Sequence, residues 1–538
     1  MFETFENNPC VLILGAGLMQ IPAIEAAKKN GFKAVVVDAN PNAVGVPCAD
    51  AFSPVDLKDK DGLLAFAKTI PNLKGVFTAG TDFSASVAFV AKSLGLSGHE
   101  YEACLNASNK VRMRSCFEKS KVGSPSFESV KKEDIANVLR RAENMKYPLV
   151  IKPSDNMGAR GCRMIRDKGE FESAVQDAVA NSRSSTAILE DYMAGSEYSI
   201  DSIVYKGTLT ITGFADRHIF YPPYFIETGH SMPTLLDSEK RRAIIEVFAR
   251  GVASLGLTEG CAKGDVKFTE NGAMIGEIAA RLSGGYMSGW TYPYASGVNL
   301  TEQALLVAVG KEPAELLKKR VRLEVSADCP FEVYDLPCEK ASAERAWISI
   351  PGVIKEICGF EEAKSVLGVK DVLPRNKEGD VVDFPRNNVQ KCGNVISVSD
   401  TFENAQKSAH EAIRKITLRL EPNNKETDAF LRGEERESEK GFPPFAYPNL
   451  NAKIKVFGDS VPPVLEEGKK AVDWFIPELL DFEEEDWNHC SIRQTLERFD
   501  TLCPNHKKID SKTFLNAILR GGIQGALYIA DCVSQVDK

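Results

Sequence analysis

The segment from Cys261 to Gly285, CAKGDVKFTENGAMIGEIAARLSGG, constrains the fold more than any other part of the chain. Apolar and polar residues alternate along it, and the pair Asn271–Gly272 interrupts the alternation near its middle. Alternation is the period of a half-buried strand, and an Asn-Gly pair favours a tight turn between antiparallel strands. The segment therefore predicts a β-hairpin, and with it an antiparallel sheet in this part of the chain.

The first hundred residues follow another pattern. The apolar run CVLILGAG is followed by helical spacing of Ile21, Ile24 and Ala27, and then by the runs AVVVD and GVFTAGTD. A further helix, VAFVAKSLGL, ends at Gly95. Strands that alternate with helices indicate a parallel sheet, so residues 1–105 are expected to form a small α/β domain.

The glycines of GAGLMQIP resemble a dinucleotide-binding turn, but the fingerprint is incomplete. Gly15 and Gly17 are present, whereas no third glycine follows where the helix must approach the strand, and Gln20 lies in the stretch instead. Such a turn needs all three glycines for close backbone approach. An NAD site, with Asp38 as its ribose ligand, is therefore not favoured.

The length of 538 residues exceeds what one hydrophobic core supports, so several domains are expected. We predict an α/β domain over residues 1–105, a domain with antiparallel sheets over 106–320, and an α+β subdomain over 321–422. Short strands (RVRLEVSA, VIKEICGF, GNVISVS) and a helix from Asn404 to Ile416 indicate the third unit. The charged stretch 421–441 is interpreted as a linker into a helical extension, residues 423–538.

Charge and cysteine usage exclude several classes of protein. Sixty-six basic against 75 acidic residues give a net charge of −9, which disfavours nucleic acid as a partner. No apolar run reaches the roughly 18 residues of a membrane span, and the N-terminus is acidic, so a cytoplasmic protein without membrane contact is expected. The 13 cysteines contain no C-x-x-C pair, and Cys503 with His506 lacks a second ligand pair, so free thiols are favoured over structural zinc.

Lys152 marks the first candidate for chemistry. It ends the apolar run YPLVIK and precedes the loop SDNMGARG, whose small residues allow backbone N–H groups to approach an anion. This pattern is typical of a phosphate cradle without the Walker arrangement. The alternative is an ordinary solvated lysine at a strand end.

Two acidic residues mark the second candidate. Glu190 and Glu197 flank a break between two strand-like runs, where the peptide groups of Asp191 and Tyr192 are expected to be exposed. Such a hinge can bind the edge of an adenine ring through its backbone, and a nearby carboxylate can accept from ribose hydroxyls. Solvated acids at a turn are the alternative.

The predicted hairpin carries the third candidate. Asp265 and Glu277 lie on its two arms, so both carboxylates can point from one face toward a divalent cation, and Arg281 follows four residues after Glu277. Mg²⁺ would neutralise the two carboxylates, and a bound triphosphate would neutralise the arginine. Structural salt bridges remain the alternative.

Taken in order, Asn109–Lys110, VIKPSDNMGARG, ILEDYMAGSEYS and GDVKF…IGEIAARLSGG resemble the ATP-grasp superfamily. The resemblance spans residues 1 to about 420 and implies that residues 106–320 form a two-lobed domain. It also implies ATP and Mg²⁺, or Mn²⁺, as cofactors. It implies phosphate contacts from Lys110 and Lys152, a covering loop from Ser154 to Gly161 that includes Gly158, adenine and ribose contacts from Glu190, Tyr192 and Glu197, Mg²⁺ ligation by Asp265 and Glu277, and stabilisation of the transferred phosphoryl group by Arg281.

The sequence departs from the superfamily pattern at one place. Many members carry an asparagine two residues after the second metal-binding acid, and Ala279 stands there, which leaves one or two metal ions open. The motif EIAAR resembles that of the L-amino acid ligase branch, in which a segment such as FIETGHSMP also occurs. Glu227 and His230 are therefore candidates for the substrate pocket, with a surface histidine as the alternative for His230.

The resemblance implies an ADP-forming carbon-nitrogen ligase that activates a carboxylate as an acyl phosphate and joins it to an amine. Its partners would be small-molecule acids and amines, and a homodimer is compatible with the sequence. Two alternatives stay open: an enzyme of the biotin-carboxylase or carbamoyl-phosphate type, and an ATP-binding regulatory protein that no longer turns over.

Overall fold

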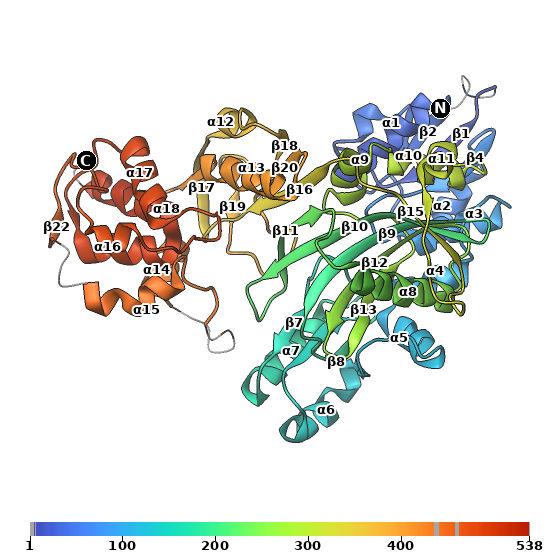
Figure 1. The fold of residues 1–538 in the computed structure, drawn as a ribbon, viewed down its shortest axis with the longest axis horizontal. Coiled ribbons are helices and arrows are strands. Elements are labelled where there is room, and N and C mark those ends of the chain that lie inside the picture. The colour runs from blue at the N-terminus through green and yellow to red at the C-terminus, as the bar shows by residue number, and fades with distance from the viewer. Residues whose placement is uncertain (1–4, 6, 435–438, 440, 458–461, 537–538) are drawn as a thin grey trace.

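The apolar runs of the first hundred residues pair as a parallel sheet in the order β3-β2-β1-β4, as predicted. This computed structural model describes residues 5, 7–434, 439, 441–457 and 462–536. Helices pack beside the sheet at the blue end of the chain in Figure 1. The elements are β1 (Cys10–Leu14), α1 (Ile21–Lys29), β2 (Lys33–Val37), β3 (Ala51–Ser53), α2 (Lys60–Ala67), β4 (Leu73–Phe77), α3 (Ser84–Ser93), α4 (Tyr101–Ser108) and α5 (Lys110–Lys119).

Gln20 occupies the turn where the dinucleotide fingerprint fails. Its amide oxygen accepts a hydrogen bond from the Ala79 backbone N–H at 3.0 Å, and the side chain is buried. It also lies against Gly15, because a Cβ placed there would meet the Gln20 Cγ at 3.3 Å. A glutamine side chain therefore ties β1 to the end of β4 at this turn.

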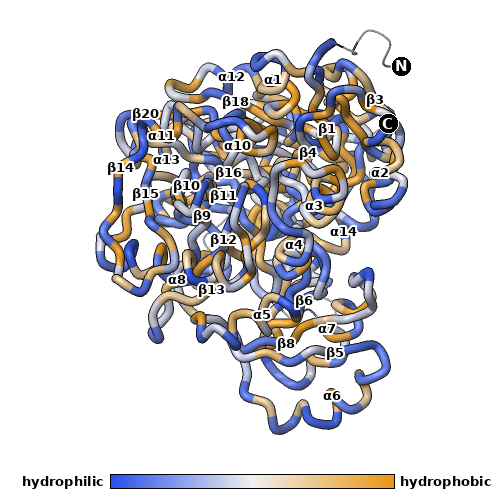
Figure 2. Tube along the Cα trace, turned by 90° about the vertical axis from the view of Figure 1, so that its right-hand side faces the viewer, coloured by the Kyte–Doolittle hydropathy of each residue, from blue (hydrophilic) through white to orange (hydrophobic). Residues whose placement is uncertain are grey.

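A small antiparallel lobe follows, with strand order β5-β8-β6-β7. Figure 2 shows it projecting away from the rest of the chain, with α6 at its far end. The predicted strands on both sides of the Ser154–Gly161 loop are confirmed. The lobe comprises β5 (Phe127–Lys131), α6 (Ile135–Arg141), β6 (Leu149–Pro153), β7 (Arg163–Ile165), α7 (Lys168–Ala180) and β8 (Thr186–Asp191).

A ten-stranded sheet forms the centre of the molecule, with the main order β13-β12-β9-β10-β11-β16-β20-β18. The predicted hairpin is confirmed, and its turn pairs Thr269 with Gly272. Its strands and the adjoining helices are β9 (Ser196–Tyr205), β10 (Thr208–Phe220), β11 (Ile226–Met232), α8 (Ser238–Leu255), β12 (Gly260–Thr269), β13 (Gly272–Ala279), α9 (Tyr292–Ser296), α10 (Leu300–Ala308), α11 (Ala314–Lys319), β14 (Val321–Arg322), β15 (Glu332–Asp335), β16 (Ala341–Trp347), β18 (Val369–Pro374) and β20 (Gly393–Ser399).

The strand expected over RVRLEVSA is much shorter than predicted, because only Val321 and Arg322 pair in β14. The helix expected from Asn404 to Ile416 is confirmed as α13. The remaining elements are β17 (Gly352–Cys358), α12 (Phe360–Lys364), β19 (Val381–Val382), α13 (Phe402–Lys415), β21 (Thr417–Leu420), α14 (Lys425–Arg432), α15 (Pro448–Phe457), β22 (Val464–Leu465), α16 (Pro477–Leu480), α17 (Ile492–Leu502), β23 (Ile509–Asp510) and α18 (Ser511–Val536).

The linker prediction is wrong for residues 425–432. Asn424 caps α14 by accepting from the Glu426 and Thr427 backbone N–H groups, and the helix buries Phe430 and Leu431. The high local charge misled the sequence reading, because the charged residues lie on the outer face of an amphipathic helix. Residues 435–438 and 440 of the expected linker lie outside the described residues.

One hydrophobic core joins the residues on both sides of position 422. It contains Trp347 and Ile354 from the first side, and Phe430, Leu496 and Tyr528 from the second. The helices α14 to α18 form the red end of the chain in Figure 1, where α18 packs on β21, and α14, α15 and α17 pack on α18. The extension is thus continuous in its packing with the unit before it. No described helix is both long and apolar enough for a bilayer crossing.

Replacing Phe430 with alanine tests whether α14 is part of this core. Phe430 is 7% exposed and stacks on Phe384 with ring centroids 6.5 Å apart. We expect Phe430→Ala to lower the free energy of unfolding by about 3 kcal/mol, as for other buried aromatic truncations. Urea-induced unfolding measures this change. The exposed neighbour Lys425→Ala is the control, and equal stability of both variants would contradict the packing of α14.

Candidate active site

A cavity of about 500 Å³ lies where the small lobe, the central sheet and the segment after β18 meet. Most of the residues singled out in the sequence line it. They are Lys110, Lys152, Gly158, Glu190, Tyr192, Glu197, Glu227, Asp265, Glu277 and Arg281. Ser154, Gly161 and His230 do not line it.

A β-bulge in the hairpin places the two predicted carboxylates, Asp265 and Glu277, on the same face. Thr269 to Val266 pair with Gly272 to Ile275 in regular register, which on its own would set Gly276 opposite Asp265. The register shifts after Val266, so that Asp265 pairs with Glu277 and Gly276 is the extra residue. Because one residue of slip moves a side chain to the other face of a sheet, the bulge is what brings both acids into the cavity.

Cations of the chain surround both acids. Asp265 lies 2.7 Å from Arg217 and also contacts Lys263, and Glu277 lies 3.3 Å from Lys110. Burial opposes ionisation of Glu277, but the nearby lysines outweigh it and lower its pKa to about 2. Two ionised oxygen donors on facing strands suit a hard cation such as Mg²⁺. Ala279 is buried and supplies no side-chain oxygen.

A buried arginine connects the bulge to the lysine of the small lobe. Arg114 donates to the Gly276 carbonyl at 2.6 Å and to Glu190 at 2.8 Å. The other oxygen of Glu190 lies 2.7 Å from the Lys152 Nζ. Burial opposes ionisation of Glu190, but the charges of Arg114 and Lys152 outweigh it and hold its pKa below the ordinary value. Glu190 thus positions Lys152 and lines the cavity with a side chain that is almost fully buried.

Lys110 lies between the hairpin acid Glu277 and the covering loop. Its Nζ donates to the Asn156 carbonyl at 2.9 Å, in addition to its ion pair with Glu277. Burial disfavours its charge, but Glu277 and Asp82 outweigh burial and raise its pKa. Lys110 remains a cation that faces the cavity, as a phosphate contact requires.

The loop from Ser154 to Gly161 covers the cavity with only part of its length. Gly158, with φ +67°, lines the cavity together with its neighbours Asn156, Met157, Ala159 and Arg160. Ser154 is fully buried at the loop's base, where its hydroxyl lies 3.2 Å from the Ser184 hydroxyl. The central residues, rather than the ends, are therefore placed to contact a ligand.

Aromatic and charged groups form one end of the cavity. Tyr192 stacks on Phe225 at 6.4 Å with the ring planes 15° apart, and Lys267 lies 5.1 Å from the centre of the Tyr192 ring. Lys267 also lies 3.6 Å from Glu197. A flat ring beside a carboxylate can receive a base and its ribose.

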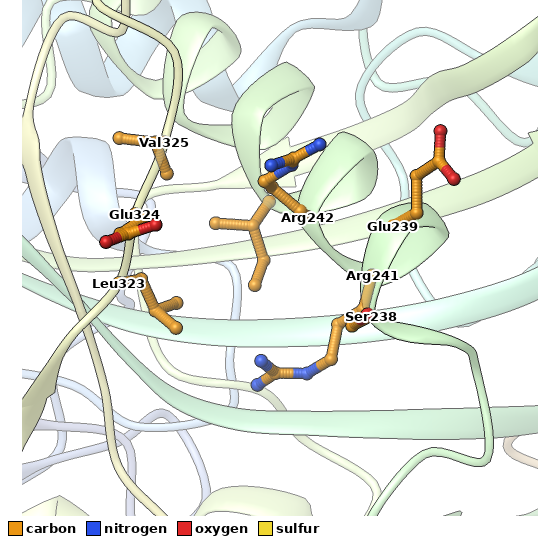
Figure 3. A pocket seen from close by; sticks show the side chains of 8 residues that line it. Ser238, Glu239, Arg241, Arg242, Leu323, Glu324 and Val325 are labelled. Atoms are coloured by element: carbon orange, nitrogen blue, oxygen red, sulfur yellow. The ribbon is translucent and has the colours of Figure 1, made fainter.

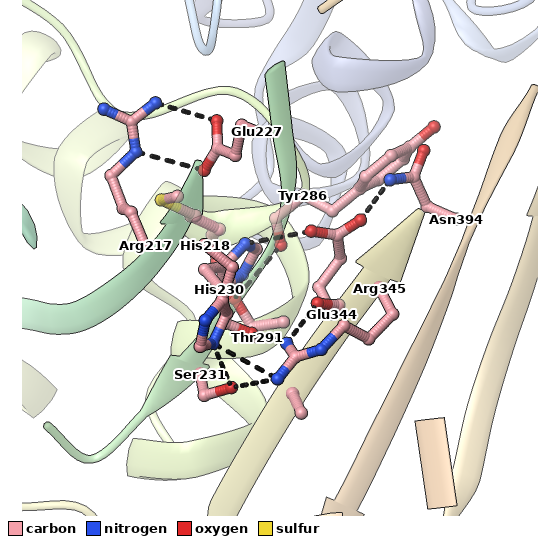
Figure 4. A network of polar contacts seen from close by, with 12 residues as sticks. Arg217, His218, Glu227, His230, Ser231, Tyr286, Thr291, Glu344, Arg345 and Asn394 are labelled. Atoms are coloured by element: carbon pink, nitrogen blue, oxygen red, sulfur yellow. Dashed lines mark hydrogen bonds and ion pairs between the residues drawn. The ribbon is translucent and has the colours of Figure 1, made fainter. Parts of the chain in front are cut away.

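Arg217 is a central residue that the sequence reasoning missed. Its guanidinium contacts Glu197, Glu227 at 2.9 Å and Asp265 at 2.7 Å, and Figure 4 shows its two-point contact with Glu227. Burial disfavours its charge, but the three carboxylates outweigh burial and raise its pKa well above the ordinary value. The signal was available, since a lone arginine near the end of an apolar strand implies acidic partners.

His230 lies behind the cavity wall on β11. Its Nε2 lies 2.7 Å from the Thr291 hydroxyl and its Nδ1 lies 3.1 Å from Glu344. Figure 4 shows these contacts. The side chain is fully buried and does not line the cavity, so His230 is neither a surface histidine nor in direct contact with the cavity. Arg281, in contrast, lines the cavity and donates to the Leu282 carbonyl at 3.0 Å.

A second hollow, of about 340 Å³, lies between the start of α8 and residues 323–325 (Figure 3). None of the residues singled out in the sequence lines it. Its Arg241 is paired with Asp335 at 2.8 Å. We assign it no function.

Two family models match the chain. Residues 145–289 match the ATP-grasp domain, and residues 346–421 match the L-amino acid ligase C-terminal domain 2. The first range holds Lys152, Glu190, Asp265, Glu277 and Arg281. The chain therefore contains an ATP-grasp domain and a segment that matches the L-amino acid ligase C-terminal domain 2, which confirms the resemblance found in the sequence and its expected fold class.

The individual proteins similar to this chain have low sequence identity to it. An uncharacterized protein, y4rH of Sinorhizobium fredii, is 22% identical over 408 residues, 74% of this chain and 80% of that protein. Carnosine synthase 1 of Mus musculus is 25% identical over 341 residues, 58% of this chain but only 41% of the mouse protein. The crystal structure of L-amino acid ligase from Bacillus licheniformis superimposes with a TM-score of 0.65 and 19% identity, covering 77% of this chain and 99% of that one, which shows the fold.

Removing the charge of Glu190 tests its positioning role. Glu190→Gln leaves Lys152 and Arg114 as buried cations without a counter-ion, which we expect to cost about 3 kcal/mol of stability. Nucleotide binding should weaken about tenfold, because Lys152 loses its fixed position. Urea unfolding and calorimetric titration with ADP measure the two effects. Glu128→Gln, on the paired strand β5, is the control and should change neither, because Glu128 contacts the surface residue Arg141 instead of a buried cation.

Asp201 provides a test by pH. It is fully buried and accepts from the Ser283 backbone and hydroxyl, and burial, only partly offset by these bonds, raises its pKa to about 6. Its contribution to stability is therefore complete below about pH 4 and is lost as the pH rises through 6. From pH 4 to pH 7, the stability of Asp201→Asn should gain about 2 to 3 kcal/mol relative to the unaltered chain. Urea unfolding across this pH range measures the two stabilities. If stability depends on pH in the same way for both proteins, the raised pKa of Asp201 is wrong.

Proposed function

We propose that this protein is an ADP-forming ligase that activates a carboxylate as an acyl phosphate and joins it to an amine. The observation that carries the proposal is the convergence of Asp265, Glu277, Lys110 and Lys152 on one cavity beside Arg281. A carboxylate is a poor electrophile. Transfer of the γ-phosphoryl group of ATP to its oxygen releases ADP and converts the carboxylate into an acyl phosphate, a mixed anhydride with a good leaving group. The amine nitrogen then attacks the acyl carbon, phosphate leaves, and the nitrogen loses a proton.

The chain's own residues supply positioning and charge. Lys110 and Lys152 hold the phosphate oxygens, Gly158 and its neighbours cover them, and Arg281 neutralises charge that spreads over the transferred group. Asp265 and Glu277 would hold Mg²⁺, which neutralises phosphate charge when bound. Tyr192 and Glu197 receive the base and the ribose. No protein nucleophile is required.

Exclusion of water is the second task of the site, because an acyl phosphate hydrolyses. The covering loop around Gly158 and the segment that ends at Lys391 approach one another across the cavity, where the Asn388 N–H donates to the Gly158 carbonyl at 3.0 Å. This contact supports a closed arrangement during transfer. Glu227, paired with Arg217, contributes to the wall on the substrate side.

Ala279 favours a second candidate, a nucleotide-binding protein that does not turn over. The position lacks the side-chain oxygen that many superfamily members place there. Mg²⁺ commonly keeps several waters, so two protein carboxylates suffice for one ion, and the ligase stays the preferred function.

Release of ADP decides between the two functions. Pairs of carboxylic acids and amines, beginning with L-amino acids, are supplied with ATP and Mg²⁺, and ADP, phosphate and product mass are measured. We expect ADP only with the right acid. Glu277→Ala should reduce the rate at least about a hundredfold, since it removes a ligand of the charge-neutralising ion. The exposed Glu361→Ala is the control, and equal ADP release by Glu277→Ala and the unaltered chain with every pair would reject the ligase.

A further inference from the structure

Residues 386–391 cross the open side of the cavity and join its two walls. The Asn388 N–H donates to Gly158 of the covering loop, and the Asn388 side-chain oxygen accepts from the Glu227 N–H of β11 at 2.8 Å. One residue thus bridges the small lobe and the central sheet. The segment is therefore placed to present its own side chains to whatever occupies the cavity.

The C-terminal extension fixes this segment from outside. Arg386 lies 3.2 Å from Glu439, and the Tyr224 hydroxyl donates to the same carboxylate at 2.7 Å. Glu439 is 5% exposed, so these contacts are shielded from solvent. The start of the segment is anchored, which limits the positions that Lys391 at its end can take.

Lys391 is a buried cation whose charge no acid in the described part of the chain neutralises at ion-pair distance. It is 4% exposed, lines the cavity, and its Nζ donates to the Glu227 backbone carbonyl at 2.8 Å. The Glu227 carboxylate is engaged by Arg217. An ammonium has three donors, and burying one without an anionic partner is unfavourable, so a missing anionic partner is indicated.

Glu344, an acid behind the wall whose charge acts on Lys391, is also engaged elsewhere. Glu344 contacts His230 at 3.1 Å and Asn394 with its two oxygens. Burial lowers the pKa of Lys391, and the positive charges of Arg375 and Arg217 add to this, against the opposing effect of Glu344 and Glu227. An anion in the cavity would reverse the balance.

Arg375 is the second cation of this group. It lies exposed at the mouth of the cavity, its Nη1 donates to the Asn388 carbonyl at 3.2 Å, and its guanidinium lies 5.5 Å from the centre of the Tyr286 ring. No ion pair holds it among the residues that the structure describes. Lys391 and Arg375 are thus two cations beside one segment, directed at one cavity.

We infer that Lys391 and Arg375 form a subsite for a carboxylate that is not activated, carried by the amine substrate. The inference rests on the ligase function proposed above. Lys110 and Lys152 are available to the phosphates, and Arg281 with the acids of the hairpin to the activated group, so this pair remains for a further anion. The amine substrate is accordingly an amino acid, recognised by its carboxylate.

Amino acids and their primary amides as acceptors test the subsite. ADP release and product mass are measured for the twenty protein L-amino acids and the matching amides, with the unaltered chain, Lys391→Met, Lys391→Arg and the exposed control Lys370→Met. Calorimetric titration of the same compounds in the presence of a non-hydrolysable ATP analogue and Mg²⁺ reports binding without turnover.

We expect the unaltered chain and Lys370→Met to prefer the amino acid over its amide about tenfold or more in KM or Kd. Lys391→Met should lose this preference and keep the KM for ATP, and Lys391→Arg should retain part of it. A Lys391→Met variant that discriminates as before, or whose KM for ATP rises equally with acid and amide, overturns the subsite. The same holds if no compound shows discrimination that depends on Lys391.

The two assays separate this inference from the ligase function. Product formation without Lys391-dependent discrimination leaves the ligase standing and removes the subsite. If binding depends on Lys391 but no pair of compounds releases ADP, the carboxylate subsite stands and the ligase function is rejected. Because removal of an unpaired buried charge is often tolerated, Lys391→Met is expected to fold, and its unchanged affinity for ADP verifies this.

Discussion

The site depends on one extra residue in a hairpin. Gly276 shifts the register by one position, and only this shift puts Glu277 on the face that carries Asp265. Its carbonyl is held by Arg114, which also binds Glu190, and Glu190 binds Lys152. The two hairpin acids and Lys152 are therefore positioned by one continuous set of buried contacts between the central sheet and the small lobe.

The C-terminal extension belongs to the same structural argument. It shares a hydrophobic core with the unit before it, and through Glu439 it anchors the segment that closes the cavity. A helical addition whose core is shared cannot be separated from the site by a flexible joint. Its described contacts give residues 423–538 a structural connection to the cavity, which the sequence did not reveal.

Much of the fold could be predicted from the sequence, because it rests on short-range patterns. Alternation with Asn271–Gly272 predicts the hairpin, and apolar runs separated by helical spacing predict the parallel sheet. The α14 helix was missed because its charged residues outnumber the apolar Phe430 and Leu431 that it buries. Composition over a window hides an amphipathic face of only a few residues.

The site was predictable in its acids and lysines, and less so in what holds them. Asp265, Glu277, Lys110 and Lys152 follow from motifs, whereas Arg114 and Arg217 act on partners that are distant in the chain. Lys391 likewise reaches the cavity through a contact with Glu227, 164 residues away. Spacing in a sequence cannot reveal such pairs, and His230 shows the converse, a motif residue that folding places behind the wall.

Arg217 connects two ends of the cavity electrostatically. It shares one guanidinium among Glu197, Glu227 and Asp265, so a change at one carboxylate alters what the guanidinium offers the other two. A ligand that draws Asp265 away from Arg217 would leave more of the guanidinium to Glu197 and Glu227. The hairpin end and the Tyr192 end of the cavity are thereby connected without any movement of the backbone.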